Sequence, residues 1–205
     1  MLSFLVGFDK KRDMRICIFG SASDDIDRLY IEAGEKLGEM LGKKGHSLVF
    51  GAGNSGMMGA VARGFHRTGA EIVGVVPSFF PDGVLFPHCT ELVKTETMRE
   101  RKAIMEERAD AFITTVGGIG TFEEFFEVLT LKQLARHAKA VTILNTNGYY
   151  DNMLKMLDTA VEGEFLTKQG RGLCADFSNA DDLVKYLDEY TEEIMDIFEL
   201  RKLGK

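Results

Sequence analysis

Ala111–Glu124 reads AFITTVGGIGTFEE, and this stretch decides which fold we expect. Its first part, Ala111–Val116, is a short apolar run rich in residues that favour strands, as expected for a strand buried on both faces. Glycines at positions 117, 118 and 120 then let the backbone approach a ligand closely, and a helix is expected to begin at Thr121. Where a parallel strand turns into a helix, backbone N–H groups and the positive end of the helix dipole converge. The stretch therefore predicts a site for a phosphate group.

The same residues also allow an interpretation without a ligand. Thr121 and Glu124 have the spacing of a capping box, in which two side chains bind the unpaired N–H groups at the start of a helix. Capping alone would explain why a helix begins here and would give the glycines no function beyond the turn. This stretch by itself leaves both interpretations open.

A group of cations upstream favours the phosphate site. Residues 97–102, TMRERK, begin with a second capping box, so three cations fall in the first turn of a helix, where they oppose its dipole. By that argument Arg101→Ala would stabilise the helix. Arg101 also shares a helix face with Ile104 and Met105, which directs it toward the packed side. A glycine-rich and a basic junction on one edge of a parallel sheet predict an anion pocket.

Strands and helices alternate along almost the whole chain, as in a doubly wound α/β domain. The chain has 205 residues, of which 45% are hydrophobic, and this suffices for one domain with a layered core. We therefore expect a single Rossmann-like domain over residues 1–205, with a mainly parallel sheet of about seven strands. An N-terminal extension, residues 1–14, and a charged helical tail, residues 191–205, complete the chain.

The expected elements follow from hydrophobic periodicity and from the glycines and prolines at the breaks. Pro77–His88, which contains all three prolines, is expected to be an apolar loop that either packs on the sheet edge or forms a wall of the site. The expected strands are Arg15–Phe19, Ser47–Phe50, Glu71–Val76, Glu91–Thr95, Ala111–Thr115, Ala140–Leu144 and Leu173–Ala175. The expected helices are Asp25–Leu41, Met57–Arg67, Met98–Ala109, Phe122–Arg136, Tyr149–Glu162 and Asp181–Leu200.

Two more glycine turns follow predicted strands. Gly20-Ser21 ends the first strand, and residues 51–56, GAGNSG, end the second and match the GxGxxG fingerprint of dinucleotide-binding proteins. We do not expect a dinucleotide, because the motif follows the second strand and because the acidic residue about twenty positions on, Glu71, begins the next strand instead of ending it. We expect instead that Gly53 lets the backbone approach a mononucleotide and that Asn54 makes a polar contact with it.

The composition restricts the partners and the compartment. Acidic residues number 32 and basic residues 25, so the net charge is −7 and we expect no nucleic-acid partner. The three cysteines and four histidines lack the spacing of metal ligands, and an odd cysteine count is typical of a reducing cytoplasm. The N-terminal charges follow a very short apolar stretch, the reverse of a signal peptide. With no segment of membrane-spanning length, we expect a cytoplasmic protein without a membrane or metal partner.

The basic and glycine-rich segments together resemble a known family. Residues 98–102, MRERK, and residues 117–124, GGIGTFEE, are similar to the paired MxERK and PGGxGTxxE motifs of the LOG family. Members of this family are cytokinin riboside 5′-monophosphate phosphoribohydrolases, and many carry the older label lysine decarboxylase-like. Residues 51–62, GAGNSGMMGAVA, and residues 147–165, NGYYDNMLKMLDTAVEGEF, are similar to two further segments of the family. The resemblance therefore covers most of the chain.

Two residues depart from the family pattern. Val116 stands where the family usually has proline, and Arg99 stands where it often has histidine. Because proline would stiffen the turn and remove one N–H group, Val116 should loosen the phosphate site without abolishing it. Arg99 adds a cation near the base or ribose, so we expect it to affect which nucleotide fits rather than the type of reaction.

The resemblance implies an enzyme that hydrolyses the N-glycosidic bond of a purine nucleoside 5′-monophosphate, AMP or an N6-modified AMP, with no cofactor. Such a bond breaks through an oxocarbenium-like sugar, so a carboxylate beside the ring, assigned to Glu124, stabilises the developing charge and orients water. Arg101 is assigned to fix the substrate or Glu124 through charge-assisted hydrogen bonds. The resemblance further assigns contacts with the substrate or its phosphate to Met98, Arg99, Lys102, Gly117, Gly118, Gly120, Thr121, Glu123 and Thr130.

The resemblance also implies a homodimer whose pocket lies near the interface. The apolar stripe that starts at Phe122 is expected to face the sheet, whereas Val128 and Leu131 lie off it and are candidates for contact with a partner subunit. Ile194 and Phe198 of the charged tail are apolar, so they are also expected to pack against another surface.

Two other functions stay open at this point. The first is a non-catalytic carrier of a phosphorylated ligand, like the molybdenum-cofactor carrier proteins that share this architecture. The presence of both Arg101 and Glu124 argues against a carrier, which needs no carboxylate beside a ribose. The second is amino-acid decarboxylation, which would require pyridoxal phosphate on a lysine, and we find no lysine whose sequence setting suggests such a bond.

Overall fold

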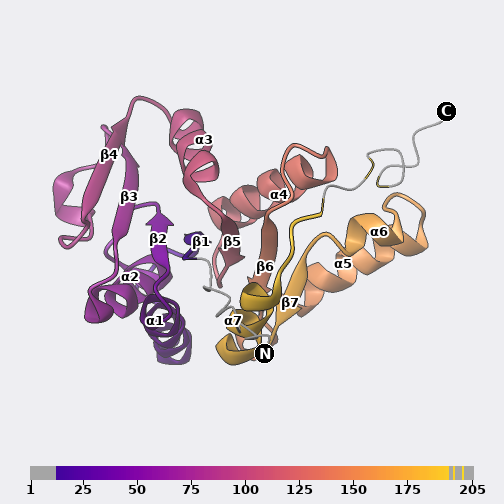
Figure 1. Cartoon of the computed structure of the whole chain (residues 1–205), viewed down its shortest axis with the longest axis horizontal. Coiled ribbons are helices and arrows are strands. Elements are labelled where there is room, and N and C mark those ends of the chain that lie inside the picture. The colour runs from indigo at the N-terminus through magenta and orange to yellow at the C-terminus, as the bar shows by residue number, and fades with distance from the viewer. Residues whose placement is uncertain (1–12, 194–195, 197–199, 201–205) are drawn as a thin grey trace, which may run out of the picture.

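The computed structural model describes residues 13–193, 196 and 200, and these form one parallel sheet with helices on both faces (Figure 1). Its seven strands lie in the order β4-β3-β2-β1-β5-β6-β7, and every neighbouring pair is parallel. The expected doubly wound α/β fold is therefore confirmed. The strands are β1 (Arg15–Phe19), β2 (Ser47–Phe50), β3 (Ile72–Pro77), β4 (Glu91–Thr95), β5 (Ala111–Thr114), β6 (Ala140–Leu144) and β7 (Ala175–Phe177).

Two hydrophobic cores, one on each face of the sheet, hold the helices in place. The helices are α1 (Arg28–Lys43), α2 (Gly56–Thr68), α3 (Met98–Arg108), α4 (Ile119–Gln133), α5 (Asp151–Glu162), α6 (Lys168–Arg171) and α7 (Ala180–Glu189). Successive side chains of a strand point to opposite faces, so Ile16 and Ile18 of β1 enter one core, and Cys17 and Phe19 enter the other. Helices α1, α2 and α7 cover the first face, and α3, α4 and α5 cover the second (Figure 1).

The structure corrects several predicted boundaries, although β1, β2, β4 and β6 have the expected bounds. Helix α4 begins at Ile119 instead of Phe122, strand β7 lies two residues later than expected, and α6 was not predicted. The last helix was expected to reach Leu200, but α7 ends at Glu189. There the backbone of Tyr190 becomes extended and its hydroxyl donates to the carbonyl of Ala138 (2.7 Å). Most of the N-terminal extension and much of the tail, with Ile194 and Phe198, lie outside the described residues.

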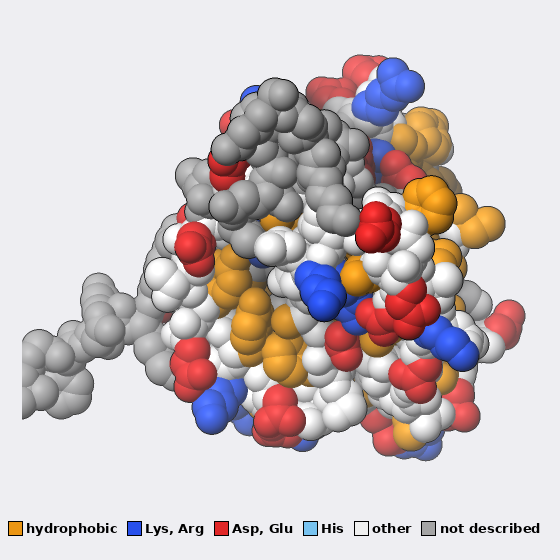
Figure 2. Space-filling view, turned by 90° about the vertical axis from the view of Figure 1, so that its right-hand side faces the viewer, with side chains coloured by type: hydrophobic (Ala, Val, Ile, Leu, Met, Phe, Trp, Pro, Cys, Tyr) orange, Lys and Arg blue, Asp and Glu red, His pale blue; other side chains and the backbone are white. Residues whose placement is uncertain are grey.

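The surface on the α5–α6 side of the molecule carries charges of both signs. Figure 2 shows Lys and Arg side chains interspersed with Asp and Glu side chains and with hydrophobic ones on this face. One such pair joins the two helices, because Nε of Arg171 lies 2.8 Å from the carboxylate of Asp158. Within the described ranges, none of the helices has both the length and the apolar composition needed to cross a bilayer.

The order of the strands changes direction between β1 and β5, and this change shapes the carboxyl edge of the sheet. The chain leaves β1 toward a helix on one face and leaves β5 toward a helix on the other, so the two loops separate. At their base the N–H of Ser21 donates to the carbonyl of Val116 (3.0 Å) and ties the loops together. Ligands of open parallel sheets bind at such a position.

Candidate active site

A cavity of about 620 Å³ lies at the carboxyl edge of the sheet, where the loops after β1, β2, β3 and β5 meet. Helix α3 contributes side chains from its first turn, and α4 contributes its first two turns. Ten of the residues expected at the site line this cavity, namely Gly20, Ser21, Gly53, Asn54, Met98, Arg101, Gly118, Gly120, Thr121 and Glu124. The fold thus brings into one wall the three glycine turns and the basic segment that the sequence singled out separately.

Five other expected site residues lie outside the cavity wall, namely Arg99, Lys102, Gly117, Glu123 and Thr130. The ammonium group of Lys102 pairs with the carboxylates of Glu123 and Glu127, 2.6 Å from the latter, so these charges are engaged with one another. Thr130 lies farther along α4 on a separate hollow of about 130 Å³, which it shares with Phe126. Contact of these residues with a substrate stays a prediction of the resemblance.

The start of α4 presents backbone donors to the cavity. The helix begins at Ile119 with Gly118 as its N-cap residue, and no side chain caps it. Within the described protein, the N–H groups of Ile119, Gly120 and Thr121 have no hydrogen-bond partner. A methyl group added at Gly118 or Gly120 would meet no atom within 4 Å, so the space in front of the helix is open. An anion can therefore approach the positive end of the helix dipole.

The capping box expected at Thr121 and Glu124 is not formed, and that prediction is wrong. The helix starts earlier than expected, so Thr121 lies inside its first turn and cannot act as the N-cap residue. Thr121 is instead buried against Gly117, where an added methyl group would lie 2.1 Å from its Oγ1. The hydroxyl of Thr97, in contrast, caps α3 as expected by accepting from the N–H of Glu100 (3.1 Å).

Arg101 and Glu124 form a buried ion pair in the cavity wall. Nη1 of Arg101 lies 2.8 Å from Oε1 of Glu124, and the two side chains are only 9% and 12% exposed. Nε of Arg101 also donates to the carbonyl of Val75 in β3 (3.2 Å), which fixes the guanidinium from a second side. Gly51 leaves room for the guanidinium, because a methyl group there would lie 2.0 Å from Nη2. The expectation that Arg101 faces the packed side is confirmed.

The environment of Glu124 changes the acidity of its carboxyl group. Burial raises the pKa of this carboxyl above its ordinary value, and the adjacent Arg101 guanidinium opposes the shift. The negative charge is thus held by one fixed partner in a place with little water around it. Such a carboxylate stabilises a positive charge that develops nearby more strongly than an exposed carboxylate would.

The start of α2, which carries the GxGxxG pattern, is occupied by the protein itself. Oδ1 of Asp24 accepts from the N–H of Gly56 (2.8 Å), and the carbonyl of Ser21 accepts from the N–H of Met58 (3.2 Å). The hydrogen bond from Gly56 lowers the pKa of the Asp24 carboxyl, so a negative charge already lies at this end of the helix dipole. A pyrophosphate would have to displace Asp24, which supports the expectation that this motif binds no dinucleotide.

The loop between β3 and β4 forms the apolar wall of the cavity, which is one of the two places expected for it. Phe80, Val84 and Leu85 line the cavity together with Met98 of α3. The N–H of Asn54 donates to the carbonyl of Val84 (3.0 Å) and holds the loop against the turn after β2. Sequence reasoning did not assign individual residues of this loop to the site, although its prolines and apolar residues indicated a covering segment. A flat aromatic base can pack against such a wall.

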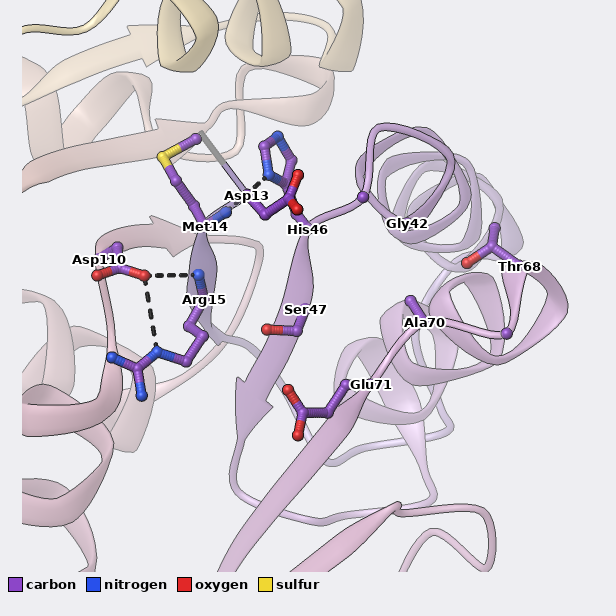
Figure 3. Close-up of a pocket in the computed structure, with 12 residues that line it drawn as sticks. Asp13, Met14, Arg15, Gly42, His46, Ser47, Thr68, Ala70, Glu71 and Asp110 are labelled. Carbon is purple, nitrogen blue, oxygen red and sulfur yellow. Dashed lines mark hydrogen bonds and ion pairs between the residues drawn. The ribbon is translucent and has the colours of Figure 1, made fainter. Parts of the chain in front are cut away.

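A second hollow, of about 580 Å³, lies at the opposite, amino edge of the sheet (Figure 3). The carboxylate of Asp110 accepts from the N–H of Arg15 (2.8 Å) and lies 3.7 Å from its guanidinium. Nδ1 of His46 accepts from the N–H of Met14 (3.2 Å). These polar groups are engaged within the protein, and ligands of open parallel sheets bind at the carboxyl edge. We therefore assign the site to the first cavity.

Among the residues that the structure describes, one lysine, Lys132, is buried, which the sequence did not indicate. The ammonium group of Lys132 in α4 donates to the hydroxyl of Tyr190 (3.0 Å), and burial lowers its pKa to about 8. A lowered pKa favours Schiff-base formation by a lysine, so Lys132 is the lysine to weigh for the decarboxylase alternative. Lys132 does not line the cavity, however, so it cannot take part in a reaction there.

Comparison with known proteins gives the family. A family model described as possible lysine decarboxylase matches residues 58–187. Two cytokinin riboside 5′-monophosphate phosphoribohydrolases of Arabidopsis thaliana are similar to the chain. One is 37% identical over 182 residues, covering 88% of this chain and 85% of the relative, and the other is 38% identical over 189 residues, covering 92% and 87%. A cytokinin riboside 5′-monophosphate phosphoribohydrolase of Oryza sativa subsp. japonica is 38% identical over 188 residues, covering 91% and 78%.

Solved structures with this fold include a molybdenum cofactor binding protein from the phototrophic bacterium Rippkaea orientalis, with a TM-score of 0.68 and 18% identity over 87% of this chain and 97% of that one. The molybdenum cofactor carrier protein from Chlamydomonas reinhardtii gives a TM-score of 0.67 and 20% identity over 87% of this chain and 100% of that one. At such identities the likeness concerns the fold alone. Because the family model matches more than half of the chain and the relatives above share over a third of the aligned residues with it, the chain belongs to the LOG family.

Proposed function

We propose that the protein hydrolyses the N-glycosidic bond of a purine nucleoside 5′-monophosphate, AMP or an N6-modified, cytokinin-type AMP, to the free base and ribose 5-phosphate. The observation that carries the proposal is that one cavity contains both the unpaired backbone donors at the start of α4 and the buried Arg101–Glu124 ion pair. The curated relatives are named for a reaction of this class. A phosphate site beside a shielded carboxylate suits a substrate whose phosphate and scissile bond lie on the same sugar.

The substrate spans the cavity from the start of α4 to the apolar loop. Its phosphate accepts hydrogen bonds from the N–H groups of Gly120 and Thr121 and lies at the positive end of the helix dipole. The base packs against Phe80, Val84 and Met98, which lie in the apolar part of the cavity wall. The ribose then lies between these two ends, next to the Arg101–Glu124 pair.

Cleavage of the bond develops positive charge on the ribose, and Glu124 is the group that stabilises it. Water attacks the anomeric carbon, the electrons of the broken bond leave with the base, and the proton released from the water ends on the base. Glu124 orients this water and accepts its proton in passing. Arg101 favours the ionised form of the carboxylate and holds it in place through the 2.8 Å contact.

A panel of nucleotides tests this function. The protein is incubated with AMP, an N6-alkylated AMP, other nucleoside monophosphates and adenosine, and the free base is measured by chromatography. We expect base to be released from the purine monophosphates and far more slowly from adenosine, because the phosphate supplies the main anchoring interaction. Equal turnover of AMP and adenosine would refute the phosphate site, and no release from any nucleotide would refute the reaction.

The two alternative functions fit less well. The carrier proteins share the fold at 18% to 20% identity, whereas the phosphoribohydrolases share 37% to 38% of aligned residues. A carrier also has no need of a buried carboxylate in its cavity, and Glu124 provides one. Decarboxylation would need a lysine in the site, and the buried Lys132 lies away from the cavity.

We also propose a homodimer with the cavity close to its interface. Ile119 and Met98, at the starts of α4 and α3, are 86% and 43% exposed, and large apolar side chains so exposed favour a covering surface. Of the two residues expected to contact a partner, Val128 packs in the core and is 1% exposed, so that assignment is wrong, and Leu131 remains the candidate. Light scattering should give twice the chain mass of 22.8 kDa, and a monomer would contradict the dimer.

A cytoplasmic location without a nucleic-acid partner completes the proposal. Cys17, Cys89 and Cys174 are all free thiols, which suits a reducing compartment. The net charge of −7 and the mixed charges of the face in Figure 2 differ from the basic stripe typical of nucleic-acid binding. Retention of a labelled oligonucleotide at physiological salt would contradict the second point.

A further inference from the structure

Three donors from other parts of the chain form hydrogen bonds with backbone carbonyls of the glycine turn after β5. The hydroxyls of Tyr150 and Tyr149 donate to the carbonyls of residues 115 (2.7 Å) and 117 (2.6 Å), and the N–H of Ser21 donates to the carbonyl of residue 116 (3.0 Å). The two tyrosines come from the segment between β6 and α5, and Ser21 follows β1. Three successive carbonyls of the turn are therefore fixed by groups that lie far away in the sequence.

The hydrogen bond from Tyr149 determines where a donor of the cavity points. In a trans peptide the carbonyl and the following N–H point in opposite directions, so a fixed carbonyl at Gly117 fixes the N–H of Gly118, which lines the cavity. Neither residue has a side chain to hinder rotation of this peptide, and no proline restricts the turn. Without the hydroxyl of Tyr149, this part of the turn would be the easiest to reorient.

Tyr149 acts through the backbone, because it does not itself line the cavity. Its ring meets the ring of Tyr30 in α1 edge-on, with centroids 6.1 Å apart, and meets Tyr150 edge-on at 4.9 Å. These contacts set the position of the hydroxyl. The hydroxyl of Tyr30 makes no hydrogen bond within the described residues, so this neighbouring ring offers a matched control.

We propose that Tyr149 is a positioning residue that directs the N–H of Gly118, as a further donor beside those of Gly120 and Thr121, toward the phosphate of the substrate. The identity of that substrate rests on the proposed function. Binding of ribose 5-phosphate measures the affinity of the phosphate site without any reaction. The positioning role of Tyr149 and the proposed hydrolysis can therefore be refuted independently.

The test is Tyr149→Phe, which keeps the ring and removes the hydroxyl. We expect KM for the nucleotide and the Kd of ribose 5-phosphate, measured by calorimetry, to rise about fivefold to tenfold, the effect of one lost hydrogen bond. Because the carboxylate is untouched, kcat should change less than about twofold. Tyr30→Phe removes a hydroxyl without a partner from the adjacent ring and should leave all three constants unchanged.

The possible outcomes separate the positioning role from the proposed function. An unchanged Kd for ribose 5-phosphate in Tyr149→Phe overturns the positioning role, even if the variant is less stable to heat. An equal rise in Tyr30→Phe overturns it as well, since the effect would then come from ring packing. If the wild type hydrolyses no nucleotide but Tyr149→Phe still weakens ribose 5-phosphate binding, the proposed function fails and the positioning role stands. No binding of ribose 5-phosphate to the wild type overturns the positioning role alone, because hydrolysis is judged separately by the release of free base.

Discussion

The two glycine-rich helix starts of this protein, at α2 and α4, lie on the same cavity but are in opposite states. At α2, Asp24 and the carbonyl of Ser21 accept from N–H groups of the first turn. At α4, the N–H groups of residues 119–121 have no partner among the described residues. The more familiar pattern, GxGxxG, thus belongs to α2, the helix start whose N–H groups already donate to acceptors within the protein. Glycines allow an anion to approach the backbone closely. The anion can bind only where the N–H groups of the helix start have no acceptor within the protein.

The two helix starts also differ in the chemistry that follows them. The sixth residue of α4 is Glu124, which pairs with Arg101 in the cavity wall. The sixth residue of α2 is Val61, which is 2% exposed and belongs to the core. Only the α4 end therefore combines free donors with an acidic group, and the following variants test this difference.

Glu124→Gln is expected to have the largest effect, because it removes the negative charge that lies in the cavity wall beside the free donors of α4. Glutamine is nearly the same size and can still accept a hydrogen bond from Arg101, so the fold should persist. We expect kcat to fall about a hundredfold or more, the typical loss for one preorganised electrostatic group, measured as release of free base. A folded variant that works at the parent rate would refute the role of Glu124, though not the phosphate site.

Arg101→Ala should lower the rate at least about tenfold and also destabilise the fold. The helix-dipole argument alone predicts the opposite sign for stability. In the structure, however, the change leaves Glu124 buried without its partner, at a cost of about 3 kcal/mol near neutral pH.

The pH dependence of Arg101→Ala sharpens this test. Arg101 opposes the raised pKa of Glu124, so its removal raises that pKa further and should move the acid limb of the rate profile to higher pH. The stability defect should be largest at high pH and shrink as pH falls through the raised pKa, because the carboxyl is then protonated. Arg99→Ala removes an exposed cation from the same turn and isolates the dipole effect. Equal melting curves for the two variants would argue against the buried ion pair.

Gly118→Asp should make the α4 end resemble the α2 end. The N-cap backbone at Gly118 is extended and an added side chain meets no atom within 4 Å, so aspartate can cap the helix there. Its carboxylate would then occupy the position of the phosphate, and we expect KM to rise at least about tenfold while thermal stability is kept or increased. Gly118→Asn caps without a charge and should have a smaller effect. An unchanged KM in Gly118→Asp would show that the phosphate binds elsewhere.

Asp24→Ala is the reverse test and should have the smallest effect. It removes the acceptor of the Gly56 N–H, so the unfolding temperature should fall by a few degrees, while KM and kcat stay within about twofold of the wild type. The pKa of Asp24 is lowered in the folded protein, so its contribution is present above the pKa of an unfolded aspartate and is lost as pH falls through the lowered value. The wild type and the variant should therefore melt alike at strongly acidic pH. A large loss of phosphate binding would mean that α2 takes part in the site.

The predicted elements were most accurate where the signal is local. Strands β1, β2, β4 and β6 have the predicted bounds, because each short run of strand-forming residues is flanked by residues that end it. The start of α4 was wrong because Thr121 and Glu124 fit a capping pattern that the structure does not form. The end of α7 was wrong because Tyr190 is anchored to Ala138, a contact that no periodicity indicates. Such errors arise where a contact between distant residues overrides a local preference.

By itself, the sequence determined the alternation of strands and helices, the three glycine turns, and the family motifs that contain Arg101 and Glu124. The tertiary structure decided at which turn the N–H groups remain available to a ligand. Asp24 lies 32 residues from Gly56, whose N–H it accepts, and Arg101 lies 23 residues from Glu124. Propensity and periodicity describe a residue and its neighbours along the chain. Whether an N–H group or a charge has a partner depends on groups that only the packing of the sheet and its helices brings together.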